Sequence, residues 1–202
     1  NSYLSRQIIH NFPHTPTNEQ LFVLNTLSDF LLSTDCDSLL LLKGYAGTGK
    51  TSLVGALVKT MVELKQKSVL LAPTGRAAKV LSDYAGQKAS TIHKKIYRQK
   101  TFSNEPSGFL PSDNLHKDTL FIVDEASMIA NQGIDSHIFG SGRLLDDLIH
   151  YVYSGENCRL MLMGDTAQLP PVMQVESPAL QADILKGYNL QVDEIQLTEV
   201  VR

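Results

Sequence analysis

The segment Gly44–Thr51 has the pattern G-x-x-x-x-G-K-T, a spacing of residue types that could bind the phosphates of a nucleotide. Its glycines let backbone N–H groups approach a β-phosphate, and a following helix adds partial positive charge. Lys50 would reach the β- and γ-phosphates, and the Thr51 hydroxyl would be a ligand of Mg²⁺. A glycine-rich turn with a chance lysine is the alternative, but an apolar run precedes the segment and helical spacing follows it. The predicted nucleotide-binding residues are Gly44, Ala46, Gly47, Thr48, Gly49, Lys50 and Thr51.

Two carboxylates follow a second apolar run, at 120–123. Because ligands of parallel sheets lie at the carboxyl ends of the strands, Asp124 and Glu125 are expected to face the phosphate site. Asp124 would hold Mg²⁺, while Glu125 would orient and deprotonate an attacking water. This second carboxylate favours hydrolysis of ATP over transfer of its phosphate to another acceptor. We therefore expect ATP and Mg²⁺ as cofactors.

A third group of polar residues follows the apolar run at 160–163, in a segment that continues to Val172. Asp165 and Gln168 would lie at the same sheet edge, beside the γ-phosphate. Pro170 and Pro171 would stiffen the chain that follows. Taken alone, the segment is equally compatible with a tight polar turn.

Positive charge is concentrated in one part of the chain. The net charge is −3, but the range 76–100 carries a local charge of +6. A local basic stretch can bind nucleic-acid phosphates even when the whole chain is acidic. The alternative is an ordinary solvated surface.

The elements that would position these residues alternate along the sequence. Apolar runs predict strands at 38–43, 68–72, 119–123 and 160–163, and a fifth strand is predicted at 194–197. Helical spacing predicts helices at 20–32, 51–64, 74–81 and 144–152. Thr17 and Gln20 match a capping box, and Thr74 is a second predicted N-cap. The pattern predicts an α/β fold: a parallel β-sheet flanked by helices on both faces, as a three-layer sandwich.

Domain organisation follows from the same pattern. Residues 1–20, with Pro13 and Pro16, are expected to be irregular, with 1–16 as an N-terminal arm and 17–202 as one domain. The range 86–117 is a predicted insertion, which contains a loop at 103–114. Because the chain begins with Asn1 rather than Met, we expect it to be a piece of a longer protein.

Composition excludes several classes of protein. With 43% apolar and 19% charged residues, the chain is neither disordered throughout nor collagen-like. Its apolar runs are too short to span a membrane, so no membrane partner is expected. The only cysteines, Cys36 and Cys158, indicate a reducing compartment, the cytoplasm, and make a poor zinc site.

The motifs together resemble those of superfamily 1 helicases, specifically the RecD-like branch that includes the α subunit of exodeoxyribonuclease V. The resemblance extends from about Pro16 to Arg202. It implies a RecA-like P-loop NTPase fold and the first motor domain of an ATP-dependent DNA helicase, with 5′ to 3′ travel on single-stranded DNA and a role in recombination or repair. The segments that carry it are Gly44–Thr51, Ala72–Ala78, Asp124–Ser127 and Gly164–Val172.

The resemblance also implies roles for residues near the nucleotide. Gln20 would read the edge of the adenine; the alternative is the capping role described above, and both could be true. Gln168 would couple the γ-phosphate to DNA. Arg202 would approach the γ-phosphate, unless the terminal residue is simply disordered.

A further set of residues would contact DNA by resemblance. Thr74 and Arg76 lie in a segment similar to one that lines the path of single-stranded DNA. Thr91 and His93 lie in a segment, 91–93, similar to a second DNA-facing motif, although a lone histidine such as His93 is more often a packing residue. Lys94 directly after it is a further candidate for DNA contact. With these motifs, the basic stretch becomes a candidate surface that follows the strand.

The chain is shorter than the family requires. The helicases it resembles use a second RecA-like domain, which closes the nucleotide site and adds another arginine, and this domain is absent from the sequence. Loss of an arginine finger costs about 10³- to 10⁵-fold in turnover, so we expect this chain alone to hydrolyse ATP weakly and to unwind nothing. Expected partners are single-stranded DNA, the second RecA-like domain and nuclease or helicase subunits. Two alternatives remain: an RNA helicase, disfavoured by the segment 168–171, and a nucleotide-gated DNA-binding subunit of a nuclease complex.

Overall fold

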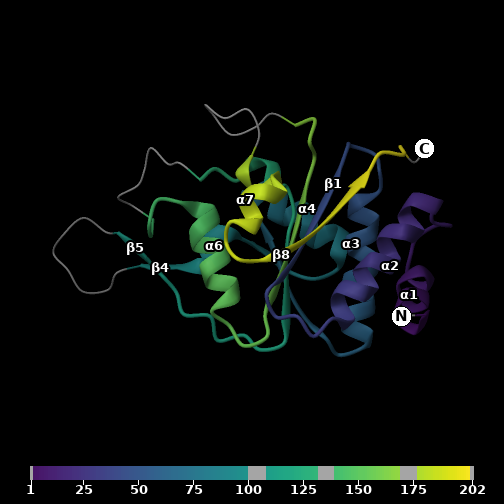
Figure 1. Ribbon diagram of the computed structural model, residues 1–202, viewed down its shortest axis with the longest axis horizontal. Coiled ribbons are helices and arrows are strands. Elements are labelled where there is room, and N and C mark those ends of the chain that lie inside the picture. Colours follow the sequence, from purple (N-terminus) through teal and green to yellow (C-terminus); the bar gives the residue numbers. More distant parts are fainter. Residues whose placement is uncertain (1, 100–107, 132–138, 169–176, 201–202) are drawn as a thin grey trace.

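The protein has a central parallel β-sheet between two layers of helices, as seen in a computed structural model that describes residues 2–99, 108–131, 139–168 and 177–200 (Figure 1). The sheet has six strands in the order β3-β2-β6-β7-β1-β8, and every neighbouring pair is parallel. The strands are β1 (Ser38–Gly44), β2 (Lys67–Ala72), β3 (Ala89–Thr91), β6 (Thr119–Val123), β7 (Arg159–Gly164) and β8 (Gln191–Leu197). The predicted fold class and the five predicted strands are confirmed.

The central strands β1, β6 and β7 are apolar along most of their length because both faces of the sheet are covered there, whereas the edge strand β8 carries exposed polar residues. In β1, all four leucines from Leu39 to Leu42 are fully buried. Leu40 and Leu42 join the core on one face, whereas Leu39 and Leu41 join the core on the other. Burial of such a side chain contributes about 1.5–3 kcal/mol, so a polar residue at any of these positions would be costly.

Four helices cover the first face, where they bury residues such as Ile8, Leu24, Leu53 and Leu81. They are α1 (Ser2–His10), α2 (Asn18–Leu32), α3 (Lys50–Glu63) and α4 (Gly75–Ala85). The capping box at Thr17 and Gln20 is confirmed, and so is the N-cap at Thr74. These caps fix the start of α2 and α4 by satisfying backbone N–H groups that have no partner within the helix.

Shorter elements cover the second face and bury residues such as Ile96, Leu148 and Leu185. They are α5 (Ile92–Ile96), α6 (Leu144–Tyr153), α7 (Ala182–Lys186) and the 3₁₀ turns η1 (Ala126–Met128) and η2 (Pro178–Leu180). Figure 1 shows α6 and α7 on the opposite side of the sheet from α1–α3. Only α6 was predicted among these elements. Within the described residues, no helix has both the length and the apolar character needed to cross a bilayer.

The prediction of an irregular segment before residue 20 is wrong for the part that forms α1. Ile8 is fully buried and Phe12 nearly so, and both belong to the core of the first face. The Asn11 amide also donates to Thr60 Oγ1 and Glu63 Oε2 of α3. The helix forms because its apolar residues repeat at helical spacing, and the two prolines come only after it ends. Where the motor domain begins stays a prediction.

The region predicted as an insertion, 86–117, contains more regular structure than expected. It supplies the edge strand β3, helix α5 and a two-stranded antiparallel sheet of β4 (Tyr97–Gln99) and β5 (Phe109–Pro111). Part of the predicted loop at 103–114 lies outside the described residues. Its last residues form β5 and the chain that follows, where Asn114 Nδ2 donates to the Tyr151 and Val152 carbonyls of α6.

Candidate functional site

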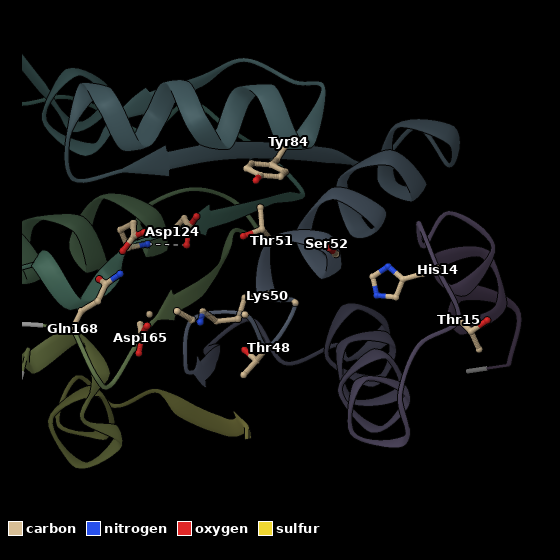
Figure 2. A pocket seen from close by; sticks show the side chains of 15 residues that line it. His14, Thr15, Thr48, Lys50, Thr51, Ser52, Tyr84, Asp124, Asp165 and Gln168 are labelled. Atoms are coloured by element: carbon tan, nitrogen blue, oxygen red, sulfur yellow. Dashed lines mark hydrogen bonds between the residues drawn. The ribbon is translucent and has the colours of Figure 1, made fainter. Parts of the chain in front are cut away.

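A cavity of about 890 Å³ lies at the carboxyl ends of β1, β6 and β7, which are neighbours in the sheet. Figure 2 shows Asp124, Asp165 and Gln168 on one side of Lys50, and His14 and Thr15 on the opposite side. Ligands of parallel sheets bind at this edge because the strands end there in loops rather than in packed helices. The lining residues are His14, Thr15, Ala46, Gly47, Thr48, Gly49, Lys50, Thr51, Ser52, Tyr84, Asp124, Glu125, Gly164, Asp165 and Gln168.

The loop between β1 and α3 is built by its glycines. Gly47 and Gly49 have φ angles of +80° and +87°, in the left-handed region that other residues rarely adopt. Gly49 is the N-cap of α3 and has no side chain to cap the helix, so the first N–H groups of α3 are presented to the cavity. A helix N-terminus that opens in this way is a site for phosphate.

The side chain of Lys50 forms hydrogen bonds with the backbone at the start of this loop. Its Nζ donates to the carbonyl oxygens of Gly44, at 2.6 Å, and Tyr45, at 2.8 Å. Burial lowers the pKa of Lys50, although the negative charges of Asp165 and Asp124 partly oppose this effect. The ammonium group is therefore held beside the glycine turn, where a phosphate would compete with the two carbonyls for it.

Asp124 and Glu125 follow β6 directly and face the same cavity. Burial raises the pKa of Asp124, and the adjacent charge of Glu125 adds to this effect. The Glu125 N–H donates to Asp124 Oδ1 at 2.9 Å, which partly offsets the rise. Glu125 itself has φ of 55° and ψ of 37°, a left-handed conformation that is unfavourable for a glutamate. Such strain is often found at functional sites, where the surrounding structure maintains it.

Asp165 and Gln168 reach the cavity from the turn that follows β7. Asp165 is buried, and its Oδ1 accepts the Ala167 N–H at 2.8 Å, which fixes the turn. Gln168 Oε1 accepts a hydrogen bond of 2.8 Å from the hydroxyl of Ser127 in η1. The segments after β6 and β7 are therefore joined by a side-chain hydrogen bond at the edge of the cavity. Residues 169–172 of the predicted motif lie outside the described part of the chain.

Among the described residues, Gln20 and Gly44 belong to the predicted set but do not line the cavity. Gln20 is fully buried, its Oε1 accepts the Thr17 N–H, and its Nε2 donates to the Thr48 carbonyl at 3.2 Å. The capping role of Gln20 is confirmed, and the reading of an adenine edge stays a prediction. Gly44 contributes its carbonyl to Lys50 instead. Arg202 lies outside the described residues.

The predicted DNA-contacting residues lie together, away from the cavity. Thr74, two positions after the end of β2, caps α4, and Thr91 caps α5 at the end of β3. The two strands are paired, with Ala72 opposite Thr91, so both caps lie at the carboxyl edge of the sheet. Arg76 and Lys94 are exposed in the first turns of the helices that follow. We call Thr74, Arg76, Thr91 and Lys94 the basic edge, after its two exposed charged side chains.

His93 differs from these exposed residues because it is half-buried among aromatic rings. Its ring centroid is 5.0 Å from that of Phe139 and 5.7 Å from that of Tyr97. Burial lowers the pKa of His93, so the side chain is neutral at pH 7. This arrangement fits the packing alternative, and contact of His93 with DNA stays a prediction.

Five residues that line the cavity were not predicted as site residues: His14, Thr15, Ser52, Tyr84 and Gly164, the last of which was named only as part of the segment 164–172. Ser52 follows the recognised motif directly and could have been included by position. His14 and Tyr84 carry no local signal, because they reach the cavity from the α1–α2 connection and from the end of α4. The Tyr84 side chain is 64% exposed and lies above Thr51 (Figure 2).

Comparison with known proteins identifies a matching family and similar helicases. The AAA domain family matches residues 30–202. The ATP-dependent RecD2 DNA helicase of Deinococcus radiodurans is 35% identical over 157 residues, which are 77% of this chain and 18% of the relative. The ATP-dependent DNA helicase dda of Enterobacteria phage T4 is 29% identical over 164 residues, 80% of this chain and 34% of the relative. The chain thus spans about a fifth to a third of these two helicases.

Solved structures show the same architecture. The Pif1 helicase from Bacteroides, in a crystal structure with ADP-AlF₃ and single-stranded DNA, has a TM-score of 0.51 and 18% sequence identity. The match covers 92% of this chain and 42% of that one. At this level of identity the likeness concerns the fold alone.

Proposed function

Because the chain belongs to the AAA domain family and is a RecA-like domain of the superfamily 1 helicase type, we propose that it is the ATP-binding motor domain of a DNA helicase. One observation carries the proposal. The structure brings Lys50, Asp124, Glu125 and Gln168, from three separate segments of the sequence, to the walls of one cavity at the sheet edge. A phosphate loop alone would suit many nucleotide-binding proteins, whereas the added carboxylates and amide suit hydrolysis.

The loop and α3 would bind the phosphates of ATP. Backbone N–H groups from Gly47 to Thr51 and the positive end of α3 would contact the β-phosphate. Lys50 would exchange its two carbonyl partners for phosphate oxygens. A phosphate oxygen carries negative charge and a carbonyl oxygen does not, so the ammonium group gains electrostatic attraction in the exchange.

The same cavity can hold Mg²⁺. The Thr51 hydroxyl and Asp124 carboxylate would be its protein ligands, and oxygen donors of this kind suit a small hard cation. Among the described residues, no three His, Cys, Asp or Glu side chains gather as a metal site. Two protein ligands fit Mg²⁺, because this ion keeps several waters and binds nucleotide phosphates as well. When bound, it would neutralise charge on the phosphates.

Glu125 would act as the general base for hydrolysis. It would take a proton from a water as the water oxygen bonds to the γ-phosphorus and the bond from that phosphorus to the β–γ bridging oxygen breaks. The products are ADP and inorganic phosphate. Gln168, held by Ser127, would lie beside the γ-phosphate and sense its presence.

Single-stranded DNA would bind along the basic edge formed by Thr74, Arg76, Thr91 and Lys94. The cap oxygens of the two threonines accept backbone N–H groups at 3.2 Å, and each hydroxyl hydrogen could still be donated to a phosphate. Arg76 and Lys94 would add charge attraction. Unwinding, its 5′ to 3′ direction and a role in recombination or repair are proposals for a whole protein with a second RecA-like domain. That domain could move relative to this one as the nucleotide changes.

Nucleotide binding tests the first part of the proposal. Titration of the chain with a fluorescent ATP analogue and Mg²⁺ should give saturable binding, which Lys50→Ala weakens. Loss of a hydrogen bond to a charged group costs about 1.5–3 kcal/mol, or roughly 10- to 150-fold in affinity. Lys59→Ala, which removes an exposed lysine from the same helix, should bind like the wild type. Equal affinity of the Lys50→Ala and wild-type chains would contradict the proposal.

The choice between DNA and RNA as the nucleic-acid partner is tested by ATP turnover of the longer protein that contains this chain, with single-stranded DNA or RNA added. Stimulation by DNA is expected. Stimulation by RNA alone would identify an RNA helicase. Nucleotide-dependent DNA affinity without turnover would identify a nucleotide-gated DNA-binding subunit.

A further inference from the structure

Glu19, in the first turn of α2, binds the chain directly after β8. Its carboxylate accepts the Thr198 N–H at 2.9 and 3.0 Å, the Thr198 hydroxyl at 2.8 Å and the Glu199 N–H at 2.8 Å. Three donors from two consecutive residues thus converge on one carboxylate, although about 180 residues separate them from it in sequence. We call residues 198–200 the β8 exit.

The next residue of α2, Gln20, binds the phosphate loop. Its Nε2 donates to the carbonyl of Thr48, and this hydrogen bond is buried. Thr48 is fully buried, and its hydroxyl donates to the Tyr45 carbonyl within the loop. Two adjacent residues at the start of α2 therefore hold two different segments: Gln20 holds the loop, and Glu19 holds the β8 exit.

The β8 exit and the phosphate loop also contact each other. β8 pairs with β1 as far as Leu197 opposite Gly44, where the loop begins. A Cβ on Gly44 would lie 2.8 Å from Thr48 Oγ1 and 3.0 Å from Leu197 Cβ, so the site admits no side chain. A Cβ on Gly47 would lie 3.3 Å from Val200 Cγ1. Figure 1 shows the end of β8 on the side of the sheet that carries α2 and α3.

We propose that Glu19 is a positioning residue that couples the phosphate loop to the β8 exit. The inference rests on the proposed function, since it concerns the loop that would bind nucleotide. Phosphates that hold Gly47 and Thr48 in place also favour the contacts of these residues with Val200 and Gln20. A coupling between two sites is reciprocal. The hydrogen bonds between Glu19 and the β8 exit should therefore strengthen nucleotide binding by the same factor by which bound nucleotide stabilises these hydrogen bonds.

A carboxylate is well suited to this position. It only accepts hydrogen bonds, and all three groups that it meets are donors. Burial alone would raise the pKa of Glu19, but hydrogen bonds from the Glu199 N–H and the Thr198 hydroxyl and N–H outweigh it and lower the pKa. The side chain is therefore ionised at neutral pH, and its charge lies at the favourable end of the α2 dipole.

Glu19→Gln tests the coupling, because it keeps the shape of the side chain but turns one acceptor into a donor. Two quantities are measured on each variant: amide hydrogen exchange at Thr198 and Glu199 with and without Mg-ATP, and nucleotide affinity. In the wild type, nucleotide should slow exchange at these two amides about fivefold, the low end of typical couplings. In Glu19→Gln, exchange should be fast in both states and affinity about fivefold weaker.

Two further variants make the result specific. Thr198→Val removes only the hydroxyl donor, so it should show the same changes to a smaller extent. Glu63→Gln is the matched control, because Glu63 is also a carboxylate that joins distant segments, through Asn11. It should match the wild type in both measurements.

The outcomes separate the inference from the proposed function. A chain that binds no nucleotide would overturn both. A chain that binds nucleotide, but whose affinity and whose exchange at Thr198 and Glu199 are the same in Glu19→Gln as in the wild type, would overturn the coupling alone. Faster exchange in Glu19→Gln with unchanged nucleotide affinity would also overturn it, because Glu19 would then be a structural anchor only.

Discussion

Ser127 and Gln168, 41 residues apart in sequence, are joined by a side-chain hydrogen bond of 2.8 Å at the edge of the cavity. Ser127 is only 2% exposed and lies in the 3₁₀ turn that follows Glu125, whereas Gln168 follows β7. The bond fixes the amide oxygen of Gln168. The direction of the Gln168 NH₂ group is therefore set by η1, the turn that follows the proposed base. A displacement of the segment after β6 can therefore shift the segment after β7, and the reverse.

Ser127→Ala should impair turnover more than nucleotide binding, because it frees the Gln168 side chain without touching the phosphate loop. A neutral hydrogen bond contributes about 0.5–1.5 kcal/mol, so we expect a fall of roughly 2- to 13-fold in DNA-stimulated ATP turnover and a Kd for ATP within twofold of wild type. Steady-state kinetics of the longer protein would measure turnover, and titration with the fluorescent ATP analogue would measure nucleotide affinity. The Ser127→Ala and Gln168→Ala changes should not be additive, since both remove one interaction. Additive losses would show that the two residues act separately.

Asp124→Asn should stabilise the fold at pH 7. Burial raises the pKa of Asp124, so the folded chain retains this proton to a higher pH than the unfolded chain does. Stability contributed by the group is therefore lost as the pH rises above the ordinary carboxyl pKa of about 3.9, and it returns as the pH falls. The neutral amide avoids this loss, with a gain of about 0.5–2 kcal/mol at pH 7, a typical size for stabilising replacements.

Urea unfolding of wild type and Asp124→Asn at several pH values would measure this gain. The difference between the two should shrink as the pH is lowered toward 3.9, because the wild-type carboxyl then becomes neutral as well. Asp193→Asn, at an exposed position of β8, is the control and should show no such gain. A gain for Asp124→Asn that is independent of pH would rule out the electrostatic explanation.

Because Glu125 has a left-handed conformation, the stability of a variant at this position should depend on which residue replaces the glutamate, even where turnover is lost in each case. Glu125→Gln and Glu125→Asn both remove the proposed base, so both should abolish ATP turnover. Asparagine tolerates φ near 55° better than glutamine does, and the left-handed penalty is of the order of 1 kcal/mol. The Asn variant should therefore be more stable than the Gln variant by about 0.5–1 kcal/mol in urea unfolding. Equal stabilities would mean that the backbone relaxes once the carboxylate is gone.

The sequence indicates the centre of the main sheet because the central strands are buried on both faces and appear as nearly continuous apolar runs. β1 and β6 can be predicted from the sequence for this reason. β3 was not visible, because it is only three residues, Ala-Ser-Thr, all of them half-buried, and it pairs with one neighbour at the sheet edge. α1 was missed although Leu4 and Ile8 have helical spacing, since the prolines of the next connection suggested an irregular segment.

The cavity was predictable where a motif follows a strand, because parallel strands bring their carboxyl ends to one edge. Lys50, Asp124 and Gln168 were found in this way. Tyr84 and His14 were not, since only tertiary packing brings the end of α4 and the α1–α2 connection to the cavity. The hydrogen bond between Ser127 and Gln168 depends on how η1 packs beside the turn after β7, which no local pattern specifies.

The basic edge should bind single-stranded DNA mainly through charge, so its residues should change the salt dependence of affinity. Each phosphate contact on a single strand contributes about 0.7 to the slope of log affinity against log salt concentration. Arg76→Ala should therefore lower the magnitude of this slope by about 0.7, and Lys94→Ala should do the same. Fluorescence anisotropy with a labelled oligonucleotide at several salt concentrations would measure the slopes.

Lys59→Ala is the matched control for this measurement, because it also removes an exposed positive charge but from α3 rather than from the carboxyl edge of β2 and β3. Its slope should equal that of the wild type. If Arg76→Ala and Lys59→Ala lower the slope equally, the net charge of the chain governs binding, and the DNA path does not follow the edge where Thr74 and Thr91 cap their helices.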